Sequence, residues 1–223
     1  MFIIEGIKSI AEFVHSPYEL HSIYHLPQYR SSLPKLPANI KLFEVNNAEL
    51  DKISTLQAPQ GILALVYIPE PRLYLPEKTF SLMLDGIQDP GNLGTIIRTA
   101  DWFGFRQVIC STDTVEVYNP KAVQATMGSL SRVAVFYEEL SALIKTSGLP
   151  VYGAVLNGNS IYDMDWGQEG FVILGNEGQG IRPQLMDLIT VPVTIPRIGG
   201  AESLNVAVSA AIFCSELSRK TQK

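Results

Sequence analysis

The stretch VILGNEGQGI, residues 172–181, joins an apolar run to a glycine-rich turn. The run GFVILG at 170–175 is typical of a strand buried on both faces of a parallel sheet. The glycines that follow allow positive φ and close approach of a ligand to the backbone. The turn contains neither the dinucleotide fingerprint G-x-G-x-x-G nor the phosphate-binding loop G-x-x-x-x-G-K-[ST]. Taken alone, the glycine cluster is therefore more simply interpreted as an ordinary turn, and Glu177 as a solvated residue in it.

Two further segments also place glycine and asparagine after an apolar run. Residues 84–105, LDGIQDPGNLGTIIRTADWFGF, begin in the run FSLMLDGI, and residues 195–217, IPRIGGAESLNVAVSAAIFCSEL, follow ITVPV. Open α/β sheets bind their ligands at the carboxyl ends of parallel strands. The sequence therefore predicts that the three segments meet at one edge of a sheet.

A helix is expected over residues 93–103, with apolar side chains at helical spacing. Asn92 is the expected N-cap, and the pair 104–105, Gly-Phe, is typical of a helix C-terminus. Arg98 falls opposite the apolar stripe. By itself Arg98 is most simply interpreted as a surface arginine paired with Asp101.

The last helix is expected over residues 204–219, with Ser203 as a candidate N-cap. Asn205 is unusual one turn into a helix, because asparagine is a poor helix former. By spacing, the expected buried face comprises Leu204, Val208, Ala211 and Ile212.

The rest of residues 80–223 alternates between strand-like and helix-like patterns, which predicts a mainly parallel sheet. Residues 69–79, PEPRLYLPEKT, contain three prolines and are expected to form a linker between two domains. Strands are expected at 106–110, 114–118, 132–137 and 151–156, and helices at 120–130, 138–147 and 183–188.

Residues 1–68 also have an α/β pattern and are expected to form a small separate domain. The expected order is β-α-β-β-α-β, with strands at 2–6, 21–26, 40–45 and 61–68 and helices at 7–16 and 48–54.

The net charge of −5 limits the ways in which the chain could bind nucleic acid. Phosphate contacts normally use lysine and arginine, yet neither half of the chain is a basic module. A basic surface must therefore be local, formed by folding or by dimerisation. No apolar run is long enough for a membrane helix, and the N-terminus is not typical of a secretory signal.

Histidine and cysteine usage excludes several kinds of site. All three histidines lie in the first 25 residues, which excludes Ser-His-Asp triads and most zinc sites from the C-terminal part. Cys110 and Cys214 are far apart and form no metal or redox motif, so a reducing cytoplasm is the simple interpretation.

The three segments together resemble the signature motifs of the SpoU (TrmH) family of RNA ribose 2′-O-methyltransferases, in the SPOUT superfamily. The motifs are D-P-x-N-x-G-x-x-x-R-T-A at 89–100, L-G-x-E-G-x-G at 174–180, and I-P followed by G-x-x-S-L-N-V-x-V within 195–208. Residues 1–68, including the run APQGILALV, resemble the substrate-binding domain that many members carry. The resemblance covers almost the whole chain.

This resemblance implies a parallel-sheet catalytic domain whose C-terminal part forms a deep trefoil knot. It also implies S-adenosylmethionine as the methyl donor and a homodimer with the RNA site near the subunit interface. The positions that the resemblance assigns to the cofactor are Gly175, Ile195 and Leu204, together with the neighbouring Asn176 and Gly178.

The implied reaction is an in-line attack of a ribose 2′-oxygen on the sulfonium methyl group, which needs no metal. Arg98 matches an arginine that is proposed to help remove the 2′-hydroxyl proton in this family. Because arginine is normally protonated, orienting an RNA phosphate is the milder alternative. The remaining catalytic positions, which would place the ribose and hold the loops, fall on Asn92, Glu177, Ser203 and Asn205.

Structured ribosomal RNA is the expected substrate by analogy, with tRNA as the alternative. A second reading is a non-catalytic RNA-binding relative, and retention of all five catalytic positions argues against it. A third is an NAD-dependent oxidoreductase, which would require the G-x-G-x-x-G fingerprint that this chain lacks. The expected partners are RNA and a second copy of the chain, without membrane or metal, in the cytoplasm.

Overall fold

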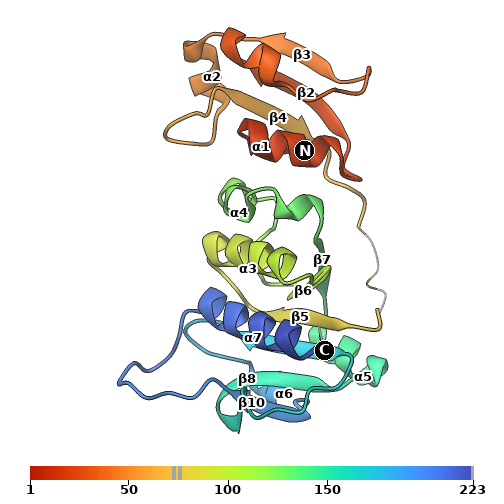
Figure 1. Ribbon diagram of the computed structural model, residues 1–223, viewed down its shortest axis with the longest axis vertical. Coiled ribbons are helices and arrows are strands. Elements are labelled where there is room, and N and C mark those ends of the chain that lie inside the picture. The colour runs from red at the N-terminus through yellow and green to blue at the C-terminus, as the bar shows by residue number, and fades with distance from the viewer. Residues whose placement is uncertain (72–73, 75–76, 222–223) are drawn as a thin grey trace.

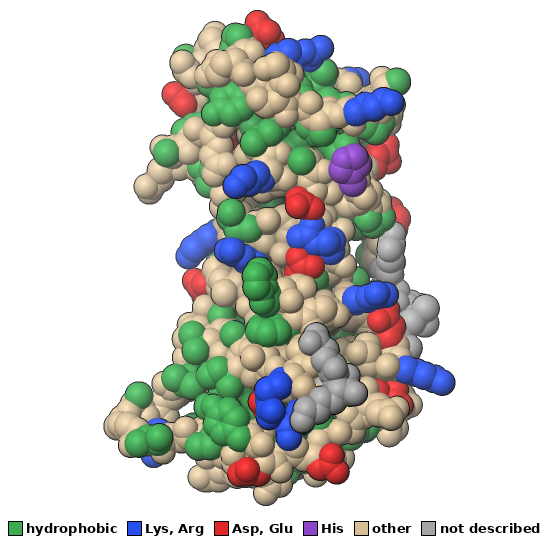
Figure 2. Space-filling model, viewed as in Figure 1, with side chains coloured by type: hydrophobic (Ala, Val, Ile, Leu, Met, Phe, Trp, Pro, Cys, Tyr) green, Lys and Arg blue, Asp and Glu red, His purple; other side chains and the backbone are tan. Residues whose placement is uncertain are grey.

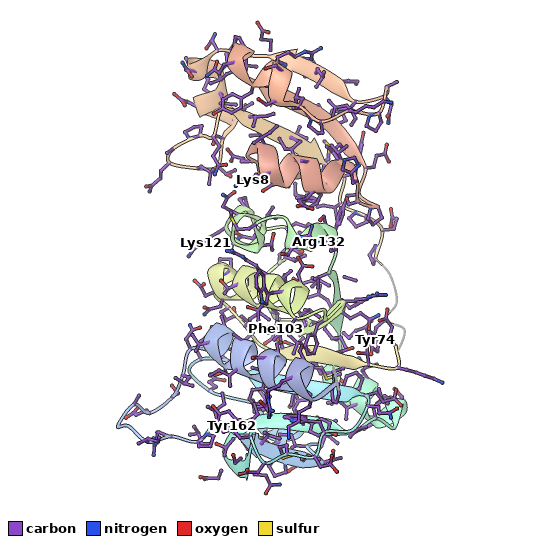
Figure 3. All side chains as sticks on the ribbon, in the orientation of Figure 1. Lys8, Tyr74, Phe103, Lys121, Arg132 and Tyr162 are labelled. Atoms are coloured by element: carbon purple, nitrogen blue, oxygen red, sulfur yellow. The ribbon has the colours of Figure 1, made fainter. Side chains whose placement is uncertain are left out.

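The computed structural model describes residues 1–71, 74 and 77–221. The expected linker at 69–79 therefore lies partly outside the described residues, at 72–73 and 75–76. Within it, the ring of Tyr74 is buried against Phe136 and Phe171, beside the second sheet (Figure 3). In the described ranges, no helix is both long and apolar enough to cross a lipid bilayer.

The N-terminal part is a four-stranded sheet with the order β1-β4-β2-β3. Strand β4 runs antiparallel to β1 and β2, whereas β2 and β3 are parallel. The observed order matches the expected β-α-β-β-α-β pattern. The elements are β1 (Phe2–Glu5), α1 (Ile7–Val14), β2 (Leu20–His25), the 3-10 turn η1 (Pro27–Ser32), β3 (Lys41–Glu44), α2 (Asn47–Ile53) and β4 (Ile62–Val66).

The C-terminal part is a six-stranded parallel sheet with the order β10-β8-β9-β5-β6-β7. The apolar run at 170–175 is the inner strand β9, which confirms its prediction as a buried strand. The strands are β5 (Phe80–Asp85), β6 (Gln107–Ser111), β7 (Ala134–Glu138), β8 (Val151–Ser160), β9 (Gly170–Gly175) and β10 (Val191–Thr194).

Helices cover both faces of this sheet, which is why its inner strands are apolar on both sides. Figure 1 shows α3 and α7 together on one face and α5 with α6 on the other. Leu82 and Leu174 belong to the core under α3 and α7, and Met83 and Ile173 to the core under α5 and α6. The helices are α3 (Pro90–Trp102), α4 (Pro120–Thr126), the 3-10 turn η2 (Ser129–Ser131), α5 (Leu140–Ser147), α6 (Pro183–Met186) and α7 (Val206–Thr221).

Helix α3 begins one turn earlier than expected, so the prediction of Asn92 as its N-cap is wrong. Asp89 caps the helix, and its carboxylate accepts a hydrogen bond from the Asn92 backbone N–H at 2.8 Å. Pro90 occupies the first turn, where a missing N–H costs nothing. The side chain of Asn92 is thereby free for other contacts. Gly104 and Phe105 end the helix as expected, with the Phe105 N–H bonded to the Ala100 carbonyl at 2.8 Å.

Residues 114–118 form an irregular loop and not the expected strand. The backbone groups of this segment find partners outside any sheet. The Tyr137 hydroxyl accepts from the Val117 N–H at 2.7 Å and donates to the Val115 carbonyl at 2.8 Å. The following helix, α4, ends at Thr126, short of the expected residue 130, because Met127 and Gly128 both adopt positive φ.

Helix α7 begins at Val206, two residues later than expected, and its buried face also differs from the prediction. Leu204 precedes the helix and is exposed, as is Val208. The helix is apolar nearly all around, so spacing alone does not fix which side faces the core. The buried apolar side chains are Val206, Ala207, Ala210, Phe213, Cys214 and Leu217.

The N-terminal sheet packs against the second part of the chain through β1, α1 and α4 (Figure 1). The rings of Phe2 and Tyr118 lie 4.7 Å apart between centroids. Arg132, at the boundary between the two parts (Figure 3), forms ion pairs with Glu12 of α1 and Asp101 of α3. Asp101 therefore pairs with Arg132, and the expected pair between Arg98 and Asp101 is wrong.

Candidate active site

A pocket of about 680 Å³ opens at the carboxyl ends of β9 and β10, beside the middle of β8. Its volume lies within the range of small-molecule binding sites. Two chain segments form most of its wall, the turn after β9 and the loop between β10 and α7. All five residues that the sequence assigned to a cofactor line it, namely Gly175, Asn176, Gly178, Ile195 and Leu204, and so do Glu177 and Ser203.

The turn after β9 is closed by its own hydrogen bonds. The backbones of Asn176 and Gly180 exchange two hydrogen bonds, of 3.0 and 2.9 Å. The Asn176 side-chain oxygen accepts from the Gly178 N–H at 2.8 Å, and its amide nitrogen donates to the Gly86 carbonyl at 2.7 Å. The Asn176 side chain is therefore occupied in holding the turn against the end of β5.

Gly175 is required by the approach of the chain to itself. A Cβ atom at this position would lie 2.1 Å from the Gly180 carbonyl carbon and 2.2 Å from the Ile181 nitrogen, both backbone atoms. Since backbone cannot move aside as a flexible side chain can, only glycine fits here.

A chain of three side chains joins the three motif segments beside the pocket. The Asn205 amide nitrogen donates to the Asn92 side-chain oxygen at 3.1 Å, and the Asn92 amide nitrogen donates to the Glu177 carboxylate at 2.5 Å. Asn205 also caps α7, since its side-chain oxygen accepts from the Ala207 N–H at 2.9 Å. Because that oxygen is held by the helix, the amide groups of both asparagines are oriented in one direction, toward the carboxylate.

This arrangement explains why asparagine stands at position 205, which helix propensity did not. Asn205 is the helix cap and does not lie one turn into the helix, so Ser203 is not the cap. Ser203 is exposed in the preceding loop, on the pocket wall.

Arg98 lies apart from this chain of side chains. It is exposed on α3, and within the described ranges it has neither a hydrogen bond nor an ion pair with another side chain. It is not among the residues that line the pocket. The structure thus brings together Asn92, Glu177 and Asn205 and leaves Arg98 exposed further along α3, the helix that also carries Asn92.

The loop from Ile195 to Asn205, the other wall of the pocket, is largely exposed. Ile198 is fully exposed and Leu204 is half-exposed. Within this loop, the Arg197 guanidinium donates to the Ala201 carbonyl at 3.1 Å. The loop projects at the lower left of Figure 1, and Figure 2 shows hydrophobic side chains on this projection.

Three charged residues next to the turn were not among the predicted site residues. Asp85, fully buried at the end of β5, accepts from the Arg182 backbone N–H at 2.8 Å and from its Nε at 2.6 Å. Arg182 also pairs with Asp113 at 3.3 Å. The hydrogen bond with Asp85 raises the pKa of Arg182, and the Ser111 hydroxyl together with Arg182 lowers the pKa of Asp113. A carboxylate directly after the apolar run FSLML was the available signal for Asp85.

The site contains oxygen and nitrogen groups but no arrangement typical of a metal centre. In the part of the chain that the structure describes, no group of three or more His, Cys, Asp or Glu side chains is placed to hold a metal ion. The pocket instead combines closely spaced backbone groups with the apolar side chains of Ile195, Leu204 and Phe213. Such a wall suits an organic ligand with a flat heterocycle and a polar tail.

Comparison with protein families assigns both parts of the chain. The profile of the SpoU rRNA Methylase family matches residues 79–215. The profile of the MRM3-like substrate binding domain matches residues 1–64. Together these matches cover both sheets.

Individual relatives agree with this assignment. The chain is 34% identical over 221 residues to the 23S rRNA (guanosine(2553)-2′-O)-methyltransferase RlmP of Bacillus subtilis, covering 97% of this chain and 88% of that protein. It superposes on a TrmH-family protein from Porphyromonas gingivalis with a TM-score of 0.89 and 37% identity, over 98% of this chain and 90% of the other. The AdoMet-bound rRNA methyltransferase from Sinorhizobium meliloti gives a TM-score of 0.84 at 26% identity, over 98% and 87%.

Proposed function

Because the chain belongs to the SpoU rRNA methylase family, we infer that it transfers the methyl group of S-adenosylmethionine to a ribose 2′-hydroxyl of ribosomal RNA. The observation that carries the inference is the chain of hydrogen bonds from Glu177 through Asn92 to Asn205. It joins the three motif segments at one end of the sheet, beside a pocket large enough for the donor. A binding module that performs no chemistry would not need this convergence.

The pocket residues fit S-adenosylmethionine. The backbone of the turn after Gly175 offers hydrogen-bonding groups to an adenosine, and Ile195 and Leu204 offer apolar contacts to its base. Asn176 contributes through its backbone, since its side chain holds the turn, and Gly178 keeps the turn clear of a side chain. When bound, the cofactor supplies an electrophilic methyl group on a sulfonium.

The protein must then orient the ribose and help its 2′-hydroxyl lose a proton, because a neutral hydroxyl is a weak nucleophile. We assign the orientation to Glu177 and Ser203 on the pocket wall and to Asn92 beside it, with Asn205 fixing the direction of the Asn92 amide. Arg98, exposed and without a protein partner in the described ranges, is free to bind the RNA phosphate next to the target ribose. Its positive charge at that position also favours loss of the hydroxyl proton.

We further propose that the active species is a homodimer in which α3 and α7 contribute to the interface. Trp102, at the end of α3, is 84% exposed, and Val208 and Leu204 are also exposed apolar side chains. Arg98 lies one helical turn before Trp102, so a dimer through this surface would bring Arg98 close to the partner molecule. Sedimentation of wild type and Trp102→Ala tests this: a dimer weakened by the substitution supports it, and a wild-type monomer refutes it.

The remaining features are also part of this proposal. We assign RNA binding to residues 1–68, a linking role to 69–79, and the catalytic domain to 80–223. The trefoil knot is supported by family membership. Cytoplasmic location is supported by the rRNA substrates of the relatives.

The decisive experiment is transfer of a radiolabelled methyl group from S-adenosylmethionine to ribosomal RNA and tRNA transcribed in vitro. A 2′-O-methyl group blocks alkaline cleavage at its own phosphodiester, so a labelled, alkali-resistant dinucleotide identifies the product. Label in tRNA alone would support the tRNA enzyme instead. RNA binding without transfer would support the non-catalytic relative.

Arg98→Ala provides the internal control for this assay. Loss of a group that orients the reactants or assists proton transfer costs about 100-fold or more in rate. S-adenosylmethionine binding should be unchanged, since Arg98 does not line the pocket. Wild-type activity in this variant would remove Arg98 from the mechanism.

A further inference from the structure

The turn at residues 176–182 is fastened to the end of β5 on both of its sides. On the outgoing side, the Asn176 amide donates to the Gly86 carbonyl at 2.7 Å. On the returning side, Arg182 bonds to Asp85 through its backbone N–H and its guanidinium. The sequence neighbours Asp85 and Gly86 therefore hold the two ends of one turn.

The Asp85–Arg182 contact is the stronger of these two fastenings. Both Asp85 carboxylate oxygens are used, one by the Arg182 N–H at 2.8 Å and the other by Arg182 Nε at 2.6 Å. The Asp85 side chain is fully buried, whereas that of Arg182 is 35% exposed. A buried carboxylate that accepts charged and backbone donors together fixes its partner in one geometry.

Arg182 also reaches the next strand. Its guanidinium lies 3.3 Å from the carboxylate of Asp113, which follows β6 and is about half-exposed. With two carboxylates around it, Arg182 is not free to bind an RNA phosphate. Its charge is neutralised within the protein by Asp85 and Asp113.

The turn that these contacts hold is one wall of the proposed cofactor pocket. Residues 176–180 all line it, and Glu177 at its tip accepts the 2.5 Å hydrogen bond from Asn92. A displacement of the turn would therefore move the pocket wall and the catalytic carboxylate together. Displacements of about 1 Å in positioning groups can cost about 100-fold in rate.

We propose that Asp85 and Arg182 are positioning residues of the methyl-transfer reaction, which set the place of the turn 176–182 for the cofactor and for Glu177. The proposal rests on the function inferred above, because it takes the pocket to be the S-adenosylmethionine site. Neither residue touches the pocket itself, so each acts through the turn.

The test combines S-adenosylmethionine titration calorimetry with hydrogen exchange of the turn amides. Arg182→Lys keeps the charge and the backbone N–H but removes the Nε contact. The double variant Asp85→Asn/Arg182→Gln removes both charges without leaving one buried alone, and urea unfolding verifies that each variant folds. Asp113→Asn, which changes the exposed partner only, is the matched control.

We expect the three variants to weaken S-adenosylmethionine binding to different degrees. The dissociation constant for S-adenosylmethionine should rise about 10-fold in Arg182→Lys and up to about 100-fold in the double variant. It should change less than about 2-fold in Asp113→Asn, because exposed ion pairs contribute little. Exchange of the Gly178, Gln179 and Gly180 amides should accelerate in the same order. A purely structural role would instead lower the fraction of folded protein and leave the dissociation constant of the folded fraction unchanged.

Two results would overturn the inference while leaving the proposed function intact. One is accelerated exchange with an unchanged dissociation constant, which would show that the turn is held but that its position does not matter. The other is unchanged exchange and binding in both Arg182 variants. Failure of folded wild-type protein to bind S-adenosylmethionine would instead refute the proposed function, and this inference with it.

Discussion

The two walls of the pocket are built in opposite ways. The turn at 176–182 is closed by backbone hydrogen bonds and fastened to β5 through Asn176 and Arg182. The loop at 195–205 is exposed for most of its length and has Arg197 bonded to the Ala201 carbonyl as its internal side-chain contact. One wall therefore has its shape before any ligand arrives, whereas the other has few contacts of its own to define it.

This contrast predicts how much each wall contributes to the free energy of ligand binding. A preformed wall loses little conformational freedom when a ligand binds, whereas an exposed loop must be ordered at that moment. The exposed apolar side chains of the loop, Ile198 and Leu204, gain burial only against a ligand or a second molecule. Asn205 marks the point at which the loop ends and connects to the fixed wall through Asn92 and Glu177.

The largest expected effect comes from Gly175→Ala, compared with Gly199→Ala on the loop. A Cβ at 175 would lie 2.1 Å from backbone, whereas one at 199 meets nothing within 4 Å. We expect Gly175→Ala to lower the free energy of unfolding by about 3 kcal/mol or more, and Gly199→Ala to change it by less than about 0.5 kcal/mol. Urea unfolding measures both. Equal effects would contradict the contrast between the walls.

The second-largest expected effect tests whether the exposed loop at 195–205 binds the cofactor. Leu204→Arg should weaken S-adenosylmethionine binding about 100-fold, or about 2.8 kcal/mol, by placing a charge in the apolar wall. The fold should survive, because Leu204 is 49% exposed. Met186→Arg, on an exposed apolar residue outside this pocket, is the matched control. Calorimetry with equal affinities for the two variants would exclude Leu204 from the site.

A third prediction separates the two roles of Asn205 at the junction of the walls. Asn205→Ala removes the cap of α7 and should cost about 1 kcal/mol of stability. Asn205→Asp keeps the accepting oxygen but cannot donate to Asn92, so stability should stay within about 0.5 kcal/mol of wild type while methyl transfer falls about 10-fold. Full activity in Asn205→Asp would show that the link between the walls is dispensable.

The smallest expected effect concerns thiol reactivity, which tests whether α7 is as accessible to solvent as the loop before it. Burial raises the pKa of the Cys214 thiol to about 12, and burial also raises that of Cys110. At pH 8, Ellman's reagent should react with neither thiol in the folded protein and with both in urea. Rapid reaction of Cys214 in the folded protein would mean that α7 opens together with the loop.

The raised pKa values of the two thiols predict that the free energy of unfolding falls at alkaline pH. A raised folded-state pKa stabilises the fold below the unfolded value of about 8.5 and loses that contribution as the pH rises above it. The free energy of unfolding should therefore fall between pH 7 and pH 8.5, by about 0.4 kcal/mol for each thiol. Cys214→Ala should remove half of this fall, and an increase of stability with pH would contradict the assignment.

Much of the fold followed from local patterns. The all-apolar run at 170–175 predicted an inner parallel strand because only a strand covered on both faces needs no polar side. The predicted strand at 114–118 failed because the partly buried hydroxyl of Tyr137 satisfies its backbone in place of a neighbouring strand. The buried face of α7 was wrong because apolar residues surround most of that helix, so periodicity contained little information.

The motif spacing identified most of the pocket wall, since chain order and residue type alone carry the resemblance to the family. It did not give the contacts that each residue makes. From the helix pattern Asn92 was expected as a cap, and from the motif as a residue that places the ribose and holds the loops. In the structure its side chain connects Asn205 to Glu177. Asp85 and Arg182 were missed because they lie 97 residues apart, and nothing local in either segment indicates the other.

The α/β class, most of the strands along the chain, the three segments that meet at the sheet edge and the chemistry that they resemble could all be predicted from the sequence. These features depend on hydrophobic period, turn residues and motif spacing, which are properties of contiguous residues. The order of the strands within each sheet, the contacts between side chains and the difference between the two pocket walls are visible only in the folded protein. Such contacts join atoms from distant parts of the chain, and their strength depends on burial and geometry, which exist only once the chain has folded.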